Sequence, residues 1–236
     1  MSFDSGVDAF LVTSLTYTWP GNEEPTLVID ELRLERGQSL LLRGPSGSGK
    51  STFLSAIAGV INVPRGSVAV AGTDLATLRG GARDRFRADH IGLIFQVFNL
   101  VPWLSAVDNV LLSCRFSEQR RKRLAGRPEQ VARRLLDELG LHDSALLAAP
   151  AMSLSVGQQQ RVAAARALLG APELILADEP TSALDDETKA SFVDLLRGEC
   201  AAAGAGLLFV SHDRGLESHF DRVVEFGELN RGAQRC

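Results

Sequence analysis

Apolar and polar residues alternate, or apolar residues run together, through the first third of the chain. The segments FLVTSLTYTW, LVIDELRL and SLLLRG show these patterns, which are typical of strands. The next segment, KSTFLSAIAGVI, differs, because its Leu54, Ile57, Ala58 and Ile61 recur at helical spacing. Two short apolar segments, GSVAVAG and HIGLIFQ, follow it. Residues 1–96 therefore predict a β-rich part that contains a helix.

The middle of the chain, residues 97–153, changes to helical periodicity. LSAVDNVLL begins with Ser105, a residue type that often caps a helix N-terminus. RPEQVARRLLDELGL places its leucines on one helical face and ends near Gly140, which predicts a C-terminal cap. These residues predict an α-helical subdomain inserted into the remainder of the chain.

Strands and helices alternate again over residues 154–236. The apolar run Leu174–Ala177 is typical of a parallel strand buried on both faces, and GLLFVSH has the same character. We therefore expect an α/β fold with a mainly parallel sheet, an N-terminal antiparallel β part and the inserted helical subdomain. Residues 1–96 and 154–236 would form the core, and residues 97–153 the insertion.

Composition limits the classes of function. The length of 236 residues fits one domain with an insertion, and the net charge of −4 argues against broad nucleic-acid binding. Cys114, Cys200 and Cys236 are far apart and odd in number, which favours free thiols in a reducing compartment. The N-terminus lacks the pattern of a signal peptide. Because no apolar run reaches the roughly 18–20 residues that span a bilayer, we expect another polypeptide to supply any membrane-spanning segment.

The segment GPSGSGKST fits the pattern G-x-x-x-x-G-K-[ST], between a predicted strand and a predicted helix. Glycines let consecutive backbone N–H groups turn toward one anion at the positive end of a helix. Lys50 adds a cation for the phosphates, and the Ser51 hydroxyl is a candidate Mg²⁺ ligand. A chance glycine-rich turn is the alternative. The candidate ATP-binding residues of this loop are Gly44, Pro45, Ser46, Gly47, Ser48, Gly49, Lys50, Ser51 and Thr52.

A second candidate site is the segment LILADE, an apolar strand that ends in two acids. Asp178 is placed to hold Mg²⁺, and Glu179 to polarise an attacking water. A solvated acidic turn is the alternative when the segment is taken alone. Together with the phosphate loop, it predicts hydrolysis of ATP or GTP.

The segment LSVGQQQRVAAARALL predicts a helix capped by Ser155. Its N-terminal N–H groups make a second anion-binding end, which the chain does not need for its own nucleotide. Head-to-tail apposition of two copies would place each Ser155 over the γ-phosphate of the other copy, so that hydrolysis requires dimerisation.

LSVGQQQR resembles the signature motif of the ABC ATPases, and the similarity extends from Leu11 to about Gly227. The resemblance implies a P-loop NTPase core of the RecA-like type, with ATP and Mg²⁺ bound between two copies of the chain. It also implies roles for single residues. These are Tyr17 stacking on adenine, Gln96, Glu179 and His212 in catalysis, Ser51, Gln96 and Asp178 on Mg²⁺, Ser155, Gly157 and Gln158 on the partner's ATP, and Asp185 of the SALD segment at the dimer seam.

Some of these positions have simpler interpretations. Tyr17 is also compatible with the surface of a sheet, with Trp19 stacking instead, and His212 with an ordinary capped loop. His90, His142 and His219 have no partner that the sequence reveals, and we expect them on the surface.

Val156 is a departure from the family pattern, which has glycine at this position of the signature. A β-branched side chain disfavours a positive φ angle. Because Ser155 and Gly157 remain, we expect a working site, with slower or altered turnover as the alternative.

The segment FQVFNLVPWLSAVDNVLL joins Gln96 to the predicted helical insertion. Its apolar residues between Phe98 and Leu104 fit either the core of the subdomain or a groove that receives a partner's helix. The resemblance implies docking of an integral membrane subunit here. The residue pattern of this segment, together with ADEPTSALD, is most similar to the lipoprotein-release and macrolide-export branch. The basic run Arg115–Arg127 fits a solvated helical face, or contact with anionic lipid heads as the alternative.

The sequence thus predicts the ATPase subunit of an ABC transporter, a homodimer with ATP that lies peripherally on the inner face of the cell membrane. The nearest alternative is an ATPase that regulates a membrane protein in cell-envelope or division signalling without transport. ABC proteins of chromosome repair or translation carry coiled coils, zinc cysteines or tandem cassettes, which this sequence lacks. A P-loop kinase would have no use for Ser155 or His212.

Overall fold

The chain forms two sheets in the computed structural model, which describes residues 8–182 and 184–232. The N-terminal sheet is antiparallel and has the order β2-β1-β4-β5. The predicted antiparallel β part is thereby confirmed. Its strands are β1 (Asp8–Tyr17), β2 (Leu27–Glu35), β4 (Val68–Val70) and β5 (Thr73–Asp74).

The central sheet has the order β6-β7-β8-β3-β9, and each neighbouring pair runs parallel. Because the strands are parallel, their carboxyl ends lie along one edge of the sheet, where α/β proteins bind ligands. The segments that the sequence singled out for chemistry follow three adjacent strands, β7, β8 and β3. The strands are β3 (Ser39–Arg43), β6 (Ile91–Ile94), β7 (Leu174–Asp178), β8 (Gly206–Ser211) and β9 (Arg222–Glu225).

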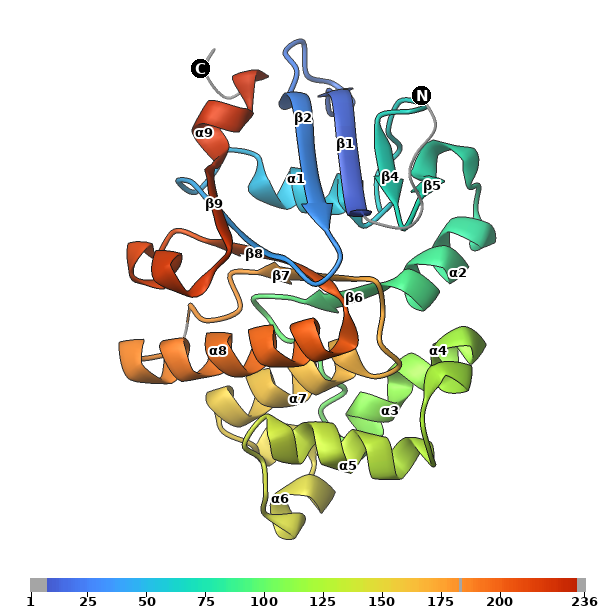
Figure 1. The fold of residues 1–236 in the computed structure, drawn as a ribbon, viewed down its shortest axis with the longest axis vertical. Coiled ribbons are helices and arrows are strands. Elements are labelled where there is room, and N and C mark those ends of the chain that lie inside the picture. Colours follow the sequence, from blue (N-terminus) through green and yellow to red (C-terminus); the bar gives the residue numbers. More distant parts are fainter. Residues whose placement is uncertain (1–7, 183, 233–236) are drawn as a thin grey trace.

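Helices cover the central sheet on one side, and the N-terminal sheet with α1 covers the other (Figure 1). The predicted helices after the phosphate loop, in the insertion and after β7 are confirmed, and the segment after β8 forms a 3-10 helix, Arg214–His219. Helix α2 was not predicted, because its arginine-rich sequence buries no residue and so has no apolar stripe. The helices are α1 (Lys50–Ile57), α2 (Gly81–His90), α3 (Ala106–Phe116), α4 (Glu118–Arg123), α5 (Pro128–Glu138), α6 (Ser144–Ala148), α7 (Val156–Leu168), α8 (Asp186–Ala203) and α9 (Phe226–Leu229).

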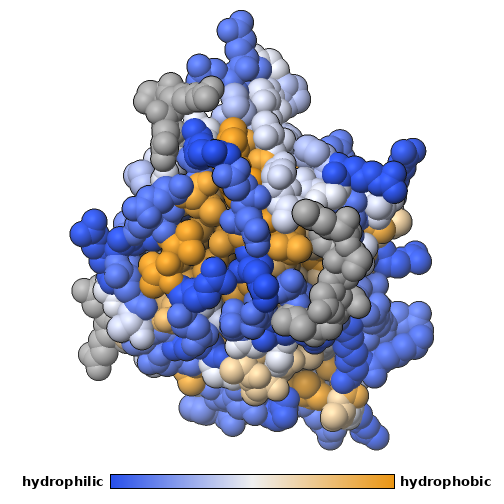
Figure 2. All heavy atoms as spheres, turned by 45° about the horizontal axis from the view of Figure 1, so that its top comes forward, coloured by the Kyte–Doolittle hydropathy of each residue, from blue (hydrophilic) through white to orange (hydrophobic). Residues whose placement is uncertain are grey.

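The central strands are buried on both faces, as their continuous apolar runs predicted. In β8, Leu207 and Phe209 join the apolar cluster under the helices, whereas Leu208 and Val210 join the cluster under the N-terminal sheet. This alternation follows from the two-residue period of a strand. Apolar residues also gather in the middle of the face shown in Figure 2, inside a hydrophilic border.

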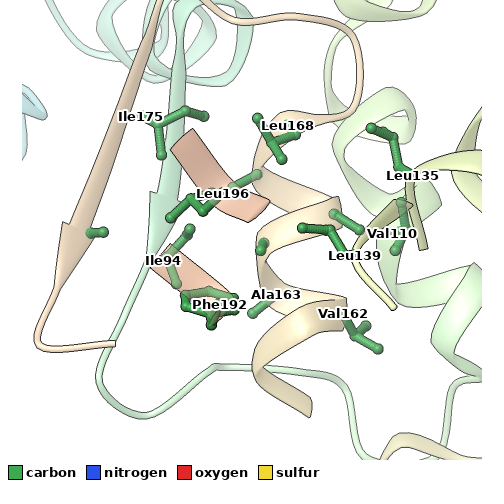
Figure 3. Packing of buried hydrophobic residues seen from close by; sticks show 14 of the residues in the cluster. Ile94, Val110, Leu135, Leu139, Val162, Ala163, Leu168, Ile175, Phe192 and Leu196 are labelled. Carbon is green, nitrogen blue, oxygen red and sulfur yellow. The ribbon is translucent and has the colours of Figure 1, made fainter. Parts of the chain in front are cut away.

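Helix α7 is the centre of the helical layer. It packs against α3, α5 and β6, and its apolar residues meet those of α8 and of the sheet (Figure 3). Gly92 of β6 permits this close approach, because a Cβ there would lie 2.4 Å from the carbonyl oxygen of Ala167. The division of the chain at residues 97 and 153 stays a prediction, since α7 contacts both the insertion and the core.

The predicted caps of the insertion are confirmed. Ser105 caps α3 by accepting a hydrogen bond from the backbone N–H of Asp108, and Gly140 follows the end of α5 with a φ of 82°. Cys114 and Cys200 are buried free thiols, and Cys236 lies outside the described residues.

Most of the basic run is exposed, as a solvated helical face predicts, but Arg120 is an exception, and contact with lipid heads stays a prediction. Arg120 is 2% exposed and donates hydrogen bonds to the carbonyl oxygens of Ile91 (2.6 Å), Ala167 (3.1 Å) and Leu169 (3.4 Å). Burial lowers its pKa to about 10, so it still carries its charge at neutral pH. Arg123 forms an ion pair of 2.7 Å with Glu173. Arg120 therefore holds the insertion against β6 and α7, and the solvated-face interpretation was wrong for this residue. Arg123 is exposed as expected, although it is paired.

The other histidines were expected on the surface, where His142 lies, whereas His90 and His219 are partly buried, and each of the three has a carboxylate partner that the sequence did not reveal. The Nδ1 of His142 lies 2.6 Å from Asp137 and that of His219 lies 2.7 Å from Asp194. His90 lies 3.0 Å from Glu173, beside Arg123. Burial alone would raise the pKa of Glu173, but the hydrogen bonds from His90 and Arg123 outweigh it and lower the pKa to about 2.

We expect Glu173→Gln to lower the free energy of unfolding by about 2 kcal/mol at pH 7. Because the folded pKa is depressed, this contribution is complete above pH ~5 and is lost as the pH falls toward 2. Urea unfolding of both proteins from pH 7 to pH 3 should therefore show a shrinking difference. The control Glu129→Gln removes an exposed pair with Arg133 and should change stability by less than about 0.5 kcal/mol. A difference that is constant down to pH 3 would contradict the assignment.

Candidate active site

The phosphate loop connects β3 to α1 at the carboxyl edge of the central sheet. Gly47 and Gly49 have φ angles of 80° and 101°, a left-handed conformation that glycine adopts without a steric cost. Gly49 is the N-cap residue of α1. The first N–H groups of a helix have no partner within it, so the loop presents backbone donors at the positive end of α1.

Lys50 lies within this loop and is 7% exposed. Its ammonium group donates hydrogen bonds of 2.7 Å to the carbonyl oxygens of Gly44 and Pro45. Burial lowers the pKa of Lys50, whereas the nearby carboxylates of Glu179 and Asp178 act in the opposite direction. The cation is thus held where it can exchange loop carbonyls for the oxygens of a bound anion.

Ser51 and Asp178 come together from two elements, as the sequence predicted for Mg²⁺ ligands. The Ser51 hydroxyl donates to Asp178 Oδ2 over 3.2 Å. Burial raises the pKa of Asp178, while this hydrogen bond lowers it. A hydroxyl and a carboxylate suit Mg²⁺, which takes oxygen ligands and completes its shell with water and phosphate oxygens. Within residues 8–182 and 184–232, no set of three or more His, Cys, Asp or Glu side chains is placed to hold a metal ion, so a protein-only cage is excluded there.

Glu179 and His212 form a second pair beside the first. The His212 Nδ1 lies 3.0 Å and 3.1 Å from the two carboxylate oxygens of Glu179. Glu179 has a φ of 45°, which is unusual for a residue with a side chain, and its N–H donates to the carbonyl of Val210 on the neighbouring strand. Such strain costs about 1–3 kcal/mol and concentrates at functional sites.

Gln96 and Ser155 border two different cavities of the described structure. Gln96 is exposed in the loop after β6 and lines a cavity of about 450 Å³ whose other wall includes Met152 and Val156.

Ser155 and Gln158 form a capping box on α7, in which the Ser155 Oγ accepts from Gln158 N–H and the Gln158 Oε1 accepts from Ser155 N–H. The Ser155 hydroxyl keeps its own proton for donation.

Val156 causes no strain in the signature segment. It is the first residue of α7 and is not among the residues with a positive φ angle. The residue is 47% exposed. Gly157 has room for a side chain, since a Cβ there would be 3.7 Å from Leu184.

Asp185 caps α8 by accepting from the backbone N–H of Thr188, and Ala183 of the same SALD segment lies outside the described residues.

Two aromatic residues lie beside the phosphate loop. Tyr17 is partly buried against the N-terminal core, and its ring meets that of Trp19 edge-on at 5.2 Å. Trp19 is 40% exposed and donates from Nε1 to the Thr52 hydroxyl over 3.3 Å. Stacking of adenine on Tyr17 stays a prediction, and Trp19 is the aromatic residue that contacts α1.

Two residues of this region were not predicted. Arg166 of α7 donates to the carbonyl oxygens of Asn99 (2.7 Å) and Phe98 (2.6 Å), and so holds the loop that follows Gln96. Asn230 contacts the phosphate loop from the C-terminal segment through the carbonyl of Ser48. Neither has a sequence signal, because each bonds to backbone atoms far along the chain.

Comparison with known families agrees with this geometry: the model of the ABC transporter family matches residues 29–182. The chain belongs to the ABC transporter family. It is an ATP-binding cassette with the P-loop NTPase fold, and it is an ATPase.

Relatives in this family include the uncharacterized ABC transporter ATP-binding protein YbbA of Escherichia coli K12. It is 40% identical over 205 residues, which are 86% of this chain and 87% of YbbA. The macrolide export ATP-binding/permease protein MacB of Burkholderia pseudomallei is 36% identical over 223 residues. That match covers 92% of this chain but 32% of MacB.

Among solved structures, the dimeric bacterial ABC transporter cassette MJ0796 superposes on this chain with a TM-score of 0.79 at 32% identity. The match covers 92% of this chain and 93% of MJ0796. A second MJ0796 structure, a dimeric post-hydrolysis state with ADP and Pi, gives a TM-score of 0.76. In the described part of this chain, none of the helices combines the length and apolar character that a bilayer crossing requires.

Proposed function

We propose that this ABC ATPase energises export or extraction of a substrate through a separate membrane subunit, by closing as a homodimer on two Mg-ATP. The observation that carries the proposal is the assembly of three groups after adjacent parallel strands. These groups are the phosphate loop after β3, the acids Asp178 and Glu179 at the end of β7, and His212 after β8.

Binding of ATP follows from the loop. The N–H groups around Gly47 and Gly49 hold the phosphates, and Lys50 turns from the Gly44 and Pro45 carbonyls to the β- and γ-phosphate oxygens. Ser51 and Asp178 would hold Mg²⁺, joined by Gln96 when its loop approaches. The ion supplies neutralisation of phosphate charge.

Hydrolysis is assigned to Glu179. Its carboxylate accepts a hydrogen bond from the attacking water, whose oxygen bonds to the γ-phosphorus while the bond to the β,γ-bridging oxygen breaks. The water's proton passes to the released phosphate, and ADP leaves with the bridging oxygen. His212 orients the Glu179 carboxylate through Nδ1 and has its other ring nitrogen available for the γ-phosphate.

The second anion-binding end serves the partner copy. Ser155, Gly157 and Gln158 lie at the exposed N-terminus of α7, and they would complete the ATP site of the facing protomer, with Asp185 at the seam. The dimeric state of the similar cassette MJ0796 supports this arrangement.

The membrane subunit would dock beside Gln96. Phe98, predicted as part of this surface, is 9% exposed and belongs to the core, whereas Val97 is 76%, Trp103 74% and Met152 71% exposed. Solvent-exposed apolar side chains in one region typify an interaction surface. Docking there would hold the chain at the inner face of the membrane and link Gln96 to the partner. The permease part named in MacB supports a membrane partner.

Regulation of a membrane protein without transport uses the same site and the same surface. We place it second because the similarity to MacB, a protein named for export, favours transport. Transport of a substrate by vesicles that contain the chain and its membrane partner would decide between the two.

We expect Glu179→Gln to retain ATP binding and to lower kcat by at least about 100-fold, since the water loses its acceptor. The closed dimer should then accumulate with ATP and Mg²⁺. Size-exclusion chromatography with and without ATP measures this, and a protein that elutes as a monomer in both would contradict the proposal.

We expect Ser155→Arg to lower kcat by roughly 100-fold, because the long arginine side chain would keep the N-terminus of α7 away from the partner's phosphates. The affinity of the monomer for ATP should remain within about twofold, since Ser155 lies outside its own loop. Isothermal titration under monomeric conditions checks the affinity. A parallel loss of monomer binding would show that Ser155 serves its own nucleotide.

We expect Trp103→Ser to reduce recovery of the chain with membranes severalfold, because it removes an exposed indole from the docking surface. ATP-dependent dimerisation of the purified chain should be retained. The control Val60→Ser changes a residue that is 61% exposed and follows α1, at the opposite edge of the sheet. Equal membrane recovery of the two variants would exclude this surface.

A further inference from the structure

The C-terminal segment, residues 226–232, lies directly against the phosphate loop. In Figure 1 its helix α9 stands beside the end of the β1–β2 hairpin. Phe226 is fully buried, its ring is 5.6 Å from that of Phe53 on α1, and its Cβ would lie 3.2 Å from a Cβ placed on Gly44. The segment therefore packs against Gly44, at the start of the phosphate loop, and against Phe53 on α1.

Asn230 makes four side-chain hydrogen bonds in this segment, and it is 0% exposed. Its Oδ1 accepts from the N–H groups of Val28 (2.8 Å) and Gly232 (3.2 Å). Its Nδ2 donates to the carbonyl oxygens of Thr26 (2.9 Å) and Ser48 (3.3 Å). One carboxamide thus joins three parts of the chain. They are the C-terminal segment, the start of β2 after the β1–β2 loop, and the phosphate loop.

The same three segments border a cavity of about 730 Å³. Residues 21–26 line it from the hairpin and residues 45–48 from the phosphate loop. Gly227 and Gly232 contribute the C-terminal side. Asn230 connects all three walls, so its loss would change the spacing of the loop and the shape of the cavity together.

The bond to Ser48 has a direct consequence for the loop. The Ser48 carbonyl and the Gly49 N–H belong to one planar trans peptide unit, in which the two groups point in opposite directions. Holding the carbonyl toward Asn230 therefore turns the Gly49 N–H away from the C-terminal segment. Gly49 has a φ of 101°, a conformation that glycine adopts readily, and the Asn230 amide is a side-chain donor that holds this peptide unit.

A second buried asparagine shows what a purely structural role looks like. Asn109 is also 0% exposed, and it bonds to the N–H and carbonyl of Val101 and to the carbonyls of Leu104 and Ser105. Its partners lie four to eight positions away, so it closes a local turn before α3. The Asn230 amide instead reaches Ser48 and Thr26, 182 and 204 positions away.

We propose that Asn230 is a positioning residue for ATP binding, which orients the Ser48–Gly49 peptide toward the phosphates from behind the loop. This inference rests on the proposed function, since it assumes that the loop binds ATP. Asn230 acts through the loop and does not touch the nucleotide.

The test compares Asn230→Ala with the matched control Asn109→Ala in the full chain. Both remove a fully buried amide with four hydrogen bonds, so both should lower the Tm. Only Asn230→Ala should raise the Kd for Mg-ATP, about tenfold, and the KM of the ATPase with it, while kcat falls far less. Isothermal titration and steady-state kinetics measure these quantities.

A Kd of Asn230→Ala within about twofold of the wild type would overturn the inference, and so would an equal rise in Asn109→Ala. If Asn230→Ala does not fold, Asn230→Asp keeps both acceptor bonds but loses both donor bonds, to Thr26 and to Ser48, and the same rise in Kd is expected. A wild-type chain that binds no ATP would refute the proposed function itself. Normal binding by the wild type with unchanged binding by both Asn230 variants would refute only the role of Asn230.

Discussion

Parallel pairing of β7, β8 and β3 is the constraint on which the site depends. Asp178 pairs in register with Val210, and Arg43, the last residue before the phosphate loop, pairs with Ser211. The register therefore ends the three strands at the same level and places the loop, the acids and His212 at one edge. Burial on both faces keeps the strands in this register, because a shift by one residue would exchange the residues of the two apolar clusters.

Side chains that bond to backbone carbonyls hold the loops around this edge. Arg166 fixes the loop after Gln96, and Asn230 fixes Ser48. Arg120 acts away from this edge, where it joins the first residue of β6 to the end of α7. A buried carbonyl without a donor costs free energy, so each of these bonds both satisfies a loop and determines its path.

The fold and the candidate catalytic groups could be predicted from the sequence, but these supports could not. Strands buried on both faces appear as continuous apolar runs, and Ser105 is recognisable as a cap from its neighbours alone, so both could be predicted. Helix α2 lacks an apolar stripe, and the charge of Arg120 suggested exposure although three carbonyls surround it. Asn230 was beyond prediction for a similar reason, since its partners lie in other segments of the chain.

The two ends of α7 have different surroundings, and both bear on the helix dipole. Arg120 places a buried cation at the C-terminal end, against the carbonyls of Ala167 and Leu169, where positive charge is favourable. At the N-terminal end the Ser155–Gln158 capping box satisfies part of the helix, but the residues around Ser155 stay accessible. The negative end is thus neutralised within the chain, while the positive end faces outward. A phosphate group supplied by a second copy is the complement that this asymmetry suits.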